Sequence, residues 1–382
     1  MHFCHLIHAC YGVAISVMTQ DTQVVIVGGG LAGLYAALQL EQANIPYVLL
    51  EAQPRLGGRI LSLPLADDSA FGVDLGPTWF WPHQARMMRL CREMGVRVFE
   101  QHVAGDVLRQ QSPSQVTRHA AGAPAMLSYR LEGGMQALVG AVAGRLNPCS
   151  RYLGHAVTQL ERRHDDWLVT AHHAGAPRHF SAQHVLLAAP PRKLMQHLDL
   201  SPWLPASLSA ALAATPTWMA AQAKFVAVYA TPFWRHAGLA GQVYSRVGPM
   251  VEIHDASAAT ESGYALFGFI GVAPSVRSQH GADAMKEACI RQLTAVFGVD
   301  AQRPVATYLK DWALDDWVVS YQDLTSSPQH PALDLSAWLP DLKRLNLHFV
   351  GSEFSAEEGG YLEGALCAVE AFTLASGLGA AR

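Results

Sequence analysis

The clearest pattern of apolar and polar positions lies near the start of the chain, between residues 23 and 59. An apolar run at 24–27 leads into a glycine-rich turn, after which apolar residues recur at helical spacing from Leu34. A second apolar run at 47–50 ends in Glu51. Strand, turn, helix and strand in this order make a βαβ unit, so the pattern predicts a parallel sheet covered by helices.

The rest of the chain continues to mix the two periodicities. Helical spacing predicts helices over residues 83–94, 132–146, 208–214, 284–297 and 359–374. Short apolar or alternating runs predict strands at 60–65, 155–160, 167–171, 184–189, 221–229, 250–254, 264–272 and 347–350. Glycine and proline predict that 71–82 is a conformationally fixed loop and not a regular element. We therefore expect an α/β protein.

The glycine turn has the spacing that dinucleotide binding requires. Gly28 allows the tight turn, Gly30 lets the backbone approach a pyrophosphate, and Gly33 permits close packing of helix and strand. Amides at the helix start face the phosphates, and Glu51 follows at the distance suited to an adenosine ribose. An ordinary strand–turn–helix without a ligand is the alternative. The surrounding strand, helix and acid all favour the nucleotide site.

Two further features suit a longer diphosphate cofactor. Arg55 and Arg59 flank the pair Gly57 and Gly58, so guanidinium groups and flexible backbone can both meet phosphate oxygens. Near the other end, a strand ends in Glu353 and a glycine-rich junction starts the last helix. A second such junction is where an α/β sheet can meet the remainder of a long cofactor.

Composition excludes several classes of protein. Half of the 382 residues are apolar and only 15% are charged, so a sizeable core is expected and disorder is not. A net charge of −4 offers no general attraction for nucleic acid or anionic lipid, and no apolar run reaches the ~18 residues that span a membrane. Six scattered cysteines indicate reduced thiols. We expect a cytoplasmic protein, either monomer or homodimer.

The first 17 residues stand apart. They are apolar and histidine-rich without the basic start or cleavage site of a signal peptide, and Met18 is the more natural start. His2, Cys4, His5, His8 and Cys10 are possible metal ligands. A disordered or non-native tail is the preferred interpretation, because nothing nearby would hold these ligands in a fixed geometry. We expect no metal site.

Two features leave alternatives open. Lys224 lies inside an apolar strand, either at a sheet edge with its amine in water or buried with partners. The aromatic residues Trp79, Phe80 and Trp81 form either core or the apolar wall of a ligand pocket.

These motifs together resemble the flavin-containing amine oxidase family, which includes monoamine and polyamine oxidases. The resemblance covers most of residues 18–375 and is strongest at the two ends, in G-G-G-L-A-G with E-A-x-x-R-x-G-G-R and in G-S-E with G-Y-L-E-G-A. The D-L-G-P motif at Asp74 is similar to the family's loop beneath the flavin. The resemblance as a whole implies an enzyme that binds FAD with residues from both ends of the chain.

The resemblance also implies roles for individual residues. FAD would be bound by Gly28, Gly30, Ala32, Gly33, Glu51, Ala52, Gly58, Arg59, Gly76, Pro77, Thr78, Val157, Glu353, Tyr361 and Leu362. Lys224 would hold a water against the reactive ring nitrogen, Trp312 would pack on the flavin, and Tyr361 would form one wall of an aromatic cage. The other wall would be Tyr321 or Gln322, depending on a one-residue gap.

Departures from the family pattern narrow the expectation. No cysteine lies near Ser320, where members with covalent flavin have one, so FAD should be non-covalent. Trp79 stands where similar L-amino acid oxidases have an arginine, which argues against a substrate carrying a carboxylate. Glu252 and Asp255 are candidate partners for a polyamine, although acids in such a region are more often solvated surface.

The expected architecture is a three-layer Rossmann-like FAD-binding domain interleaved with a mixed-sheet α+β substrate domain. Residues 18–80, 150–205 and 340–382 would form the first, and 81–149 and 206–339 the second. The expected activity is oxidation of a small-molecule amine, with hydride transfer to FAD and reoxidation by dioxygen to give hydrogen peroxide and an imine or aldehyde. The alternatives are another FAD-dependent oxidation, such as a desaturase, protoporphyrinogen or reduced-nicotinamide oxidase, and a non-catalytic flavoprotein.

Overall fold

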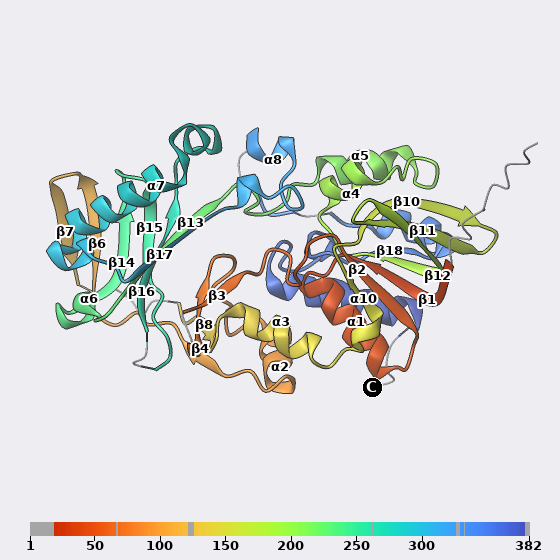
Figure 1. The fold of residues 1–382 in the computed structure, drawn as a ribbon, viewed down its shortest axis with the longest axis horizontal. Helices are drawn as coiled ribbons and strands as arrows, with labels where there is room; N and C mark the ends of the chain where they lie inside the picture. The colour runs from red at the N-terminus through yellow and green to blue at the C-terminus, as the bar shows by residue number, and fades with distance from the viewer. Residues whose placement is uncertain are drawn as a thin grey trace, which may run out of the picture.

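The computed structural model of the chain describes residues 19–65, 68–120, 126–260, 263–325, 329–331 and 333–378. Two large sheets lie toward opposite ends of an elongated molecule, as Figure 1 shows. The histidine- and cysteine-rich start of the chain lies outside the described residues.

The first sheet contains the βαβ unit. Its strand order is β10 (Ala156–Arg163), β11 (Asp166–His173), β12 (Ala176–Leu187), β1 (Thr19–Val27), β2 (Tyr47–Glu51) and β9 (Arg151–Leu153), with β18 (Leu347–Phe349) paired to β12. The pairs β12–β1, β1–β2, β2–β9 and β12–β18 are parallel, while β10, β11 and β12 form an antiparallel meander. From Val24 to Val27 both faces of β1 are buried, as the continuous apolar run predicts.

Helices cover both faces of this sheet. Val24 and Ile26 of β1 pack with α1 (Leu31–Gln42) and α10 (Leu362–Ser376), while Val25 and Val27 face the side of α4 (Pro191–His197), α5 (Ala206–Ala214) and α9 (Leu339–Leu345). The predicted three-layer, Rossmann-like α/β architecture is confirmed.

The second sheet is mostly antiparallel. Its order is β17 (Ala306–Asp311), β13 (Ala223–Tyr229), β16 (Tyr264–Ile270), β15 (Met250–Asp255), β14 (Leu239–Ser245), β6 (Asp106–Ser112) and β7 (Gln115–His119), and only β14–β6 is parallel. The long helix α7 (Pro274–Phe297) buries Met285, Cys289 and Leu293 against its outer face. Alternate residues of β13 therefore point away from α7 and toward the rest of the molecule.

Several elements lie outside the two large sheets. They are the hairpin of β3 (Ser62–Leu65) and β4 (Asp68–Asp74), the antiparallel pair β5 (Val98–Glu100) and β8 (Tyr129–Leu131), the helices α2 (Ala85–Glu93), α3 (Met135–Ala143), α6 (Phe233–His236) and α8 (Tyr321–Thr325), and short 3-10 helices. Within the described part of the chain, no helix combines the length and apolarity needed to cross a bilayer.

The structure corrects one detail of the sequence analysis. The predicted loop at 71–82 begins as strand, because β4 pairs with β3 as far as Asp74. Of the segment 81–149, which was expected in the second domain, β6 and β7 belong to the second sheet, while α2 and α3 pack against α10 and α1. Met87, Leu90, Leu138 and Val142 bury their side chains in the core that contains α1, so these helices extend the first domain.

Candidate active site

A single cavity of about 570 Å³ reaches from the glycine turn to the second sheet. Among the residues singled out from the sequence, the following line it: Gly28, Gly30, Ala32, Glu51, Ala52, Gly58, Arg59, Gly76, Pro77, Thr78, Val157, Lys224, Trp312, Glu353, Tyr361 and Leu362. Gly33 and Tyr321 do not. Residues from both ends of the chain and from both sheets thus meet at one site.

The glycine turn is built for close backbone approach. Gly28 has φ +110°, and a Cβ there would lie 2.8 Å from the carbonyl oxygen of Ala188. A Cβ on Gly33 would lie 1.9 Å from the carbonyl oxygen of Gly28, so this glycine permits α1 to start directly against the turn. Around Gly30 the nearest atom to an added Cβ is 3.9 Å away, in Gly58, which leaves space on the cavity side. Gly33, which does not line the cavity, therefore allows the shape of the turn by its close contact with Gly28.

Glu51 closes the end of β2 beside the turn. One carboxylate oxygen accepts from the amide of Gly29 at 2.6 Å and the other from the amide of Gln53 at 2.7 Å. Burial raises the pKa of Glu51, and the two amide bonds oppose that shift. The carboxylate thus orders the turn besides facing the cavity.

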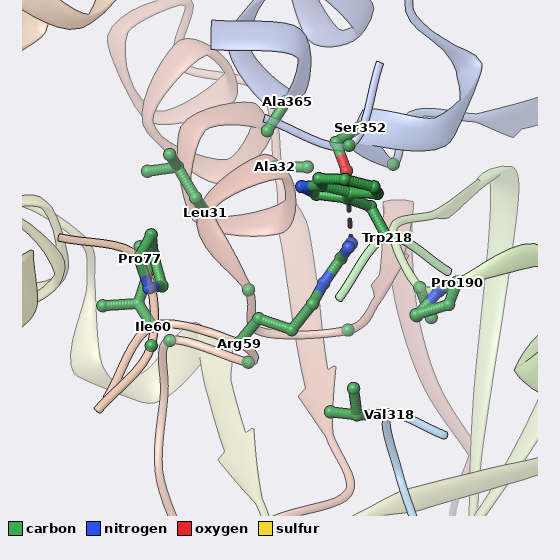
Figure 2. Close-up of a pocket in the computed structure, with 18 of the residues that line it drawn as sticks. Leu31, Ala32, Arg59, Ile60, Pro77, Pro190, Trp218, Val318, Ser352 and Ala365 are labelled. Carbon is green, nitrogen blue, oxygen red and sulfur yellow. Dashed lines mark hydrogen bonds between the residues drawn. The ribbon is translucent and has the colours of Figure 1, made fainter. Parts of the chain in front are cut away.

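The two arginines after β2 have different tasks. Arg55 donates to the carbonyl oxygens of Ile60 at 2.9 Å and Gly58 at 2.7 Å, so its guanidinium holds the loop and does not line the cavity. Arg59 does line the cavity and donates to Ser352 Oγ at 3.2 Å, the dashed line in Figure 2. The loop after β2 is therefore tied to the segment after β18.

Arg59 also pairs with Glu353, the acid of the carboxy-terminal motif. Arg59 Nη2 lies 2.7 Å from Glu353 Oε1, and the Glu353 side chain is 0% exposed. The contact is an ion pair without hydrogen-bond geometry, so Oε1 keeps its accepting capacity. A fully buried carboxylate oxygen with an unused lone pair beside the cavity suits a ligand hydroxyl.

Lys224 lies at the other end of the cavity, on an interior strand. β13 has β17 on one side and β16 on the other, and Lys224 is 2% exposed, so the sheet-edge alternative is wrong. Its Nζ donates to the carbonyl oxygen of Gly76 at 3.2 Å and to Thr78 Oγ1, and lies 4.0 Å from the centre of the Phe267 ring. Burial lowers the pKa of Lys224 to about 7, against the attraction of Asp74.

Asp74 supports this region from outside the cavity. Its Oδ1 accepts from Ser62 Oγ at 2.5 Å and from the amide of Met135 at 2.8 Å, which joins the β3–β4 hairpin to the start of α3. Burial raises the pKa of Asp74, while Arg130 and Lys224 lower it. Leu75 to Thr78, which directly follow Asp74, line the cavity.

Aromatic side chains from separate segments also line the cavity. Trp312 donates from Nε1 to the carbonyl oxygen of Leu75 at 2.9 Å. The aromatic loop was expected to form either core or the wall of a pocket, and its residues do both. Trp79 and Trp81 line the cavity, while Phe80 lies in the core. Strand-like alternation within the loop sends neighbouring rings to opposite sides.

The surroundings of Tyr361 differ from the expected cage. Tyr321 is 76% exposed in α8 and lies outside the cavity, and Gln322 does not line it either. Trp81 and Trp218 instead approach the Tyr361 ring, with centroid distances of 5.6 and 6.5 Å. Trp218, which Figure 2 labels, belongs to a turn with no recognisable motif, so sequence analysis missed it.

His330 connects two of these rings. It stacks on Trp218 at 3.6 Å and on Tyr361 at 4.8 Å, and its Nε2 lies 3.2 Å from the Tyr361 hydroxyl. Trp81, Trp218, His330 and Tyr361 therefore form a packed aromatic cluster from four separate segments of the chain.

Comparisons with known proteins agree with this geometry. The model of the family described as flavin containing amine oxidoreductase matches residues 110–368, more than half of the chain. A model described as NAD(P)-binding Rossmann-like domain matches residues 26–94. The chain belongs to the flavin-containing amine oxidoreductase family, and the resemblance found in its motifs is confirmed.

Individual relatives are similar over shorter stretches. A probable flavin-containing monoamine oxidase A of Dictyostelium discoideum is 33% identical over 131 residues, which cover 34% of this chain and 28% of that protein. Amine oxidase [flavin-containing] B of Homo sapiens is 37% identical over 83 residues, covering 22% of this chain and 16% of that protein. The aligned stretches span less than a third of either relative.

Solved structures match over nearly the whole fold. A putrescine oxidase variant has a TM-score of 0.78 at 19% identity, covering 94% of this chain and 99% of that chain. Cyclohexylamine oxidase from Brevibacterium oxydans has a TM-score of 0.76 at 18% identity, covering 93% and 98%. At these identities the likeness shows the shared fold.

Proposed function

We propose that this chain is an FAD-dependent oxidase of primary or secondary amines. One observation carries the proposal: the same cavity contains the glycine turn at one end and the buried Lys224 at the other. A buried amine with a strongly shifted pKa inside a cleft is typical of a functional site. Membership of the flavin-containing family implies a flavin, and the length of the cavity suits a dinucleotide form of it.

The residues of the cavity fit FAD. The open side of Gly30 and the amides at the start of α1 suit the pyrophosphate, with Arg59 beside it. Glu51 and Val157, which line the cavity, would hold the adenosine end, and Glu353 would offer the unused acceptor of its Oε1 to a ribityl hydroxyl. The starts of α1 and α10 both face the cavity, through Ala32 and Leu362.

Binding of FAD would be non-covalent. Of the four cysteines in the described part of the chain, Cys91, Cys149, Cys289 and Cys367, none lines the cavity. Precipitation of the holoprotein with acid should release all of the flavin into the supernatant. Flavin that stays with the pellet would contradict this part of the proposal.

When bound, FAD would supply the acceptor for hydride from the carbon beside the amine nitrogen. The chain would orient the neutral amine between the Tyr361 ring and its aromatic neighbours, and the apolar wall would exclude water. Lys224, held by Gly76 and Thr78, would hold a proton or a water at its Nζ near the reacting ring. Dioxygen would accept two electrons and two protons and leave as hydrogen peroxide. Water would convert the released imine to an aldehyde and ammonia, or to an aldehyde and a primary amine when the substrate is secondary.

Anaerobic mixing of the holoprotein with a panel of amines tests the proposal. Flavin absorbance should bleach with at least one amine, and the rate should rise with pH as the substrate amine loses its proton. Bleaching by a porphyrinogen or by reduced nicotinamide, and by no amine, would instead favour another oxidation on this fold. Bound flavin that no donor bleaches would indicate a non-catalytic flavoprotein.

A further inference from the structure

The second sheet carries an acidic side chain at the far end of the cavity. Besides Glu252, the acidic residues that line the cavity are Glu51 and Glu353, within the described part of the chain. Both of these are already engaged near the glycine turn, by backbone amides and by Arg59 respectively. Of these three acidic residues, Glu252 is the one that lies on the second sheet.

Strand register places Glu252 in one row with Lys224. Lys224 pairs with Phe269 across β13 and β16, and Phe269 pairs with Glu252 across β16 and β15. Directly opposed residues in antiparallel strands share a face, and all three line the cavity. Two strand spacings separate Lys224 from Glu252, about 10 Å between backbones. Glu252 therefore lies on the same wall as Lys224, beyond the Phe269 ring.

One oxygen of the Glu252 carboxylate is held by His254, and the other is available to a ligand. His254 Nε2 lies 2.7 Å from Glu252 Oε1, and the hydrogen bond from His254 lowers the pKa of Glu252. Within the part of the chain that the structure describes, Oε2 accepts no hydrogen bond. The Glu252 side chain is 38% exposed, so a ligand can reach this oxygen.

Aromatic packing holds His254 in place. Its ring lies 4.9 Å from Trp79 in a T-shaped contact and 5.4 Å from Phe267 in a stacked one. His254 is therefore a positioning residue for the carboxylate. Asp255, the other candidate from the sequence, is excluded, because Arg235 and Trp234 bind its oxygens and it does not line the cavity.

We propose that Glu252 binds a second cationic nitrogen of the substrate, so that diamines and related dications are preferred over simple monoamines. The inference rests on the proposed amine oxidation. One end of a diamine would lie unprotonated near Lys224 and Tyr361, while the other end, as ammonium, would donate to Glu252 Oε2. The Phe269 and Trp79 rings would contact the methylene chain between them. A substrate carboxylate would be repelled at this position.

Kinetics with the FAD-loaded protein test the proposal. Anaerobic flavin reduction would be measured with a series of α,ω-diamines and with n-alkylamines of equal carbon number. The wild-type protein should favour the diamine. In Glu252→Gln the diamine-to-monoamine ratio of the second-order rate constant for flavin reduction should fall about tenfold, the effect of losing one charge-assisted hydrogen bond. Glu100→Gln, a change of the same kind at an exposed position outside the cavity, should keep the wild-type ratio. A wild-type protein without preference, or an unchanged ratio in Glu252→Gln, would overturn the proposal.

A binding measurement separates this inference from the proposed function. A diamine with fully substituted carbons beside both nitrogens has no hydride to transfer, and its binding to the holoprotein can be followed by calorimetry. Its affinity should fall about tenfold in Glu252→Gln. If no amine bleaches the flavin but this dication still binds in a Glu252-dependent way, the oxidase proposal is wrong and the cation site stands. Equal affinity for both proteins would show that the cation site is wrong.

Discussion

The two ends of the cavity are built by different means. At the glycine turn, backbone groups and helix starts face the cavity, and a missing Cβ decides what fits. At the second sheet, side chains on alternate strand positions face the cavity, among them Lys224, Phe269 and Glu252. Backbone recognition tolerates no added atom, whereas the side-chain wall can be exchanged one residue at a time. We therefore expect changes at the first end to abolish cofactor binding and changes at the second to alter chemistry and selectivity.

The strongest test of this difference is Gly33→Ala. The new Cβ would meet the carbonyl oxygen of Gly28 at 1.9 Å, a backbone atom that cannot move without opening the turn. Overpacking costs about 1–3 kcal/mol or more, so FAD content and the free energy of unfolding should both fall. Gly140→Ala in α3 is the matched control, since its Cβ meets nothing within 4 Å. It should stabilise the protein by about 0.5–1 kcal/mol. Retention of full FAD content by Gly33→Ala would contradict the close-packed turn.

Lys224→Met should leave FAD bound and slow reoxidation of the reduced flavin by dioxygen by at least about tenfold, as expected for loss of a general acid–base group. Stopped-flow mixing of the reduced holoprotein with oxygen measures the rate. Lys343→Met, at an exposed position on α9, serves as the control. An unchanged reoxidation rate in Lys224→Met would remove Lys224 from the mechanism.

The same variant tests the pKa of Lys224 through stability. The folded state holds the pKa of Lys224 at about 7, below the usual lysine value of 10.5, so the unfolded chain binds more protons between these pH values. The contribution of Lys224 to stability therefore increases as pH rises from about 7 toward 10.5, and it is a penalty at lower pH. Urea unfolding of the FAD-free protein across this range should lose that upward slope in Lys224→Met. A slope equal to that of the wild type would mean that the amine is not buried as described.

A smaller effect should distinguish Tyr361 from Tyr321, the two tyrosines that the sequence analysis assigned to the aromatic cage. Tyr361→Leu removes a ring in contact with Trp81 and His330, and aromatic pairs contribute about 0.5–1.5 kcal/mol beyond their buried area. The value of kcat/KM for amines should fall about tenfold or less, which corresponds to about 1.4 kcal/mol. Tyr321→Leu, outside the cavity, should have no effect. A comparable loss in both variants would restore Tyr321 to the site.

The outcome for particular residues shows how far sequence reasoning reached. The βαβ unit, the glycine turn and Glu51 were predicted and lie together, because their contacts are local and their spacing follows from backbone geometry. The carboxy-terminal junction was found by the same signal. Trp218 and His330 were missed, since they reach Tyr361 only through long-range packing. Tyr321 and Gln322, the two candidates for the other wall of the cage, both lie outside the cavity, because they belong to α8, where Tyr321 is exposed.

Glycine spacing and apolar runs dictate backbone conformation locally, so the class of fold and the glycine-turn end of the cavity could be predicted from the sequence. Long-range packing decides that Lys224 lies on an interior strand, that Arg59 pairs with Glu353, and that Glu252 and not Asp255 lines the cavity. Each of these outcomes depends on strand order, register or a partner distant in sequence. A residue's neighbours along the chain carry no information about such contacts, because they form only when separate segments pack together.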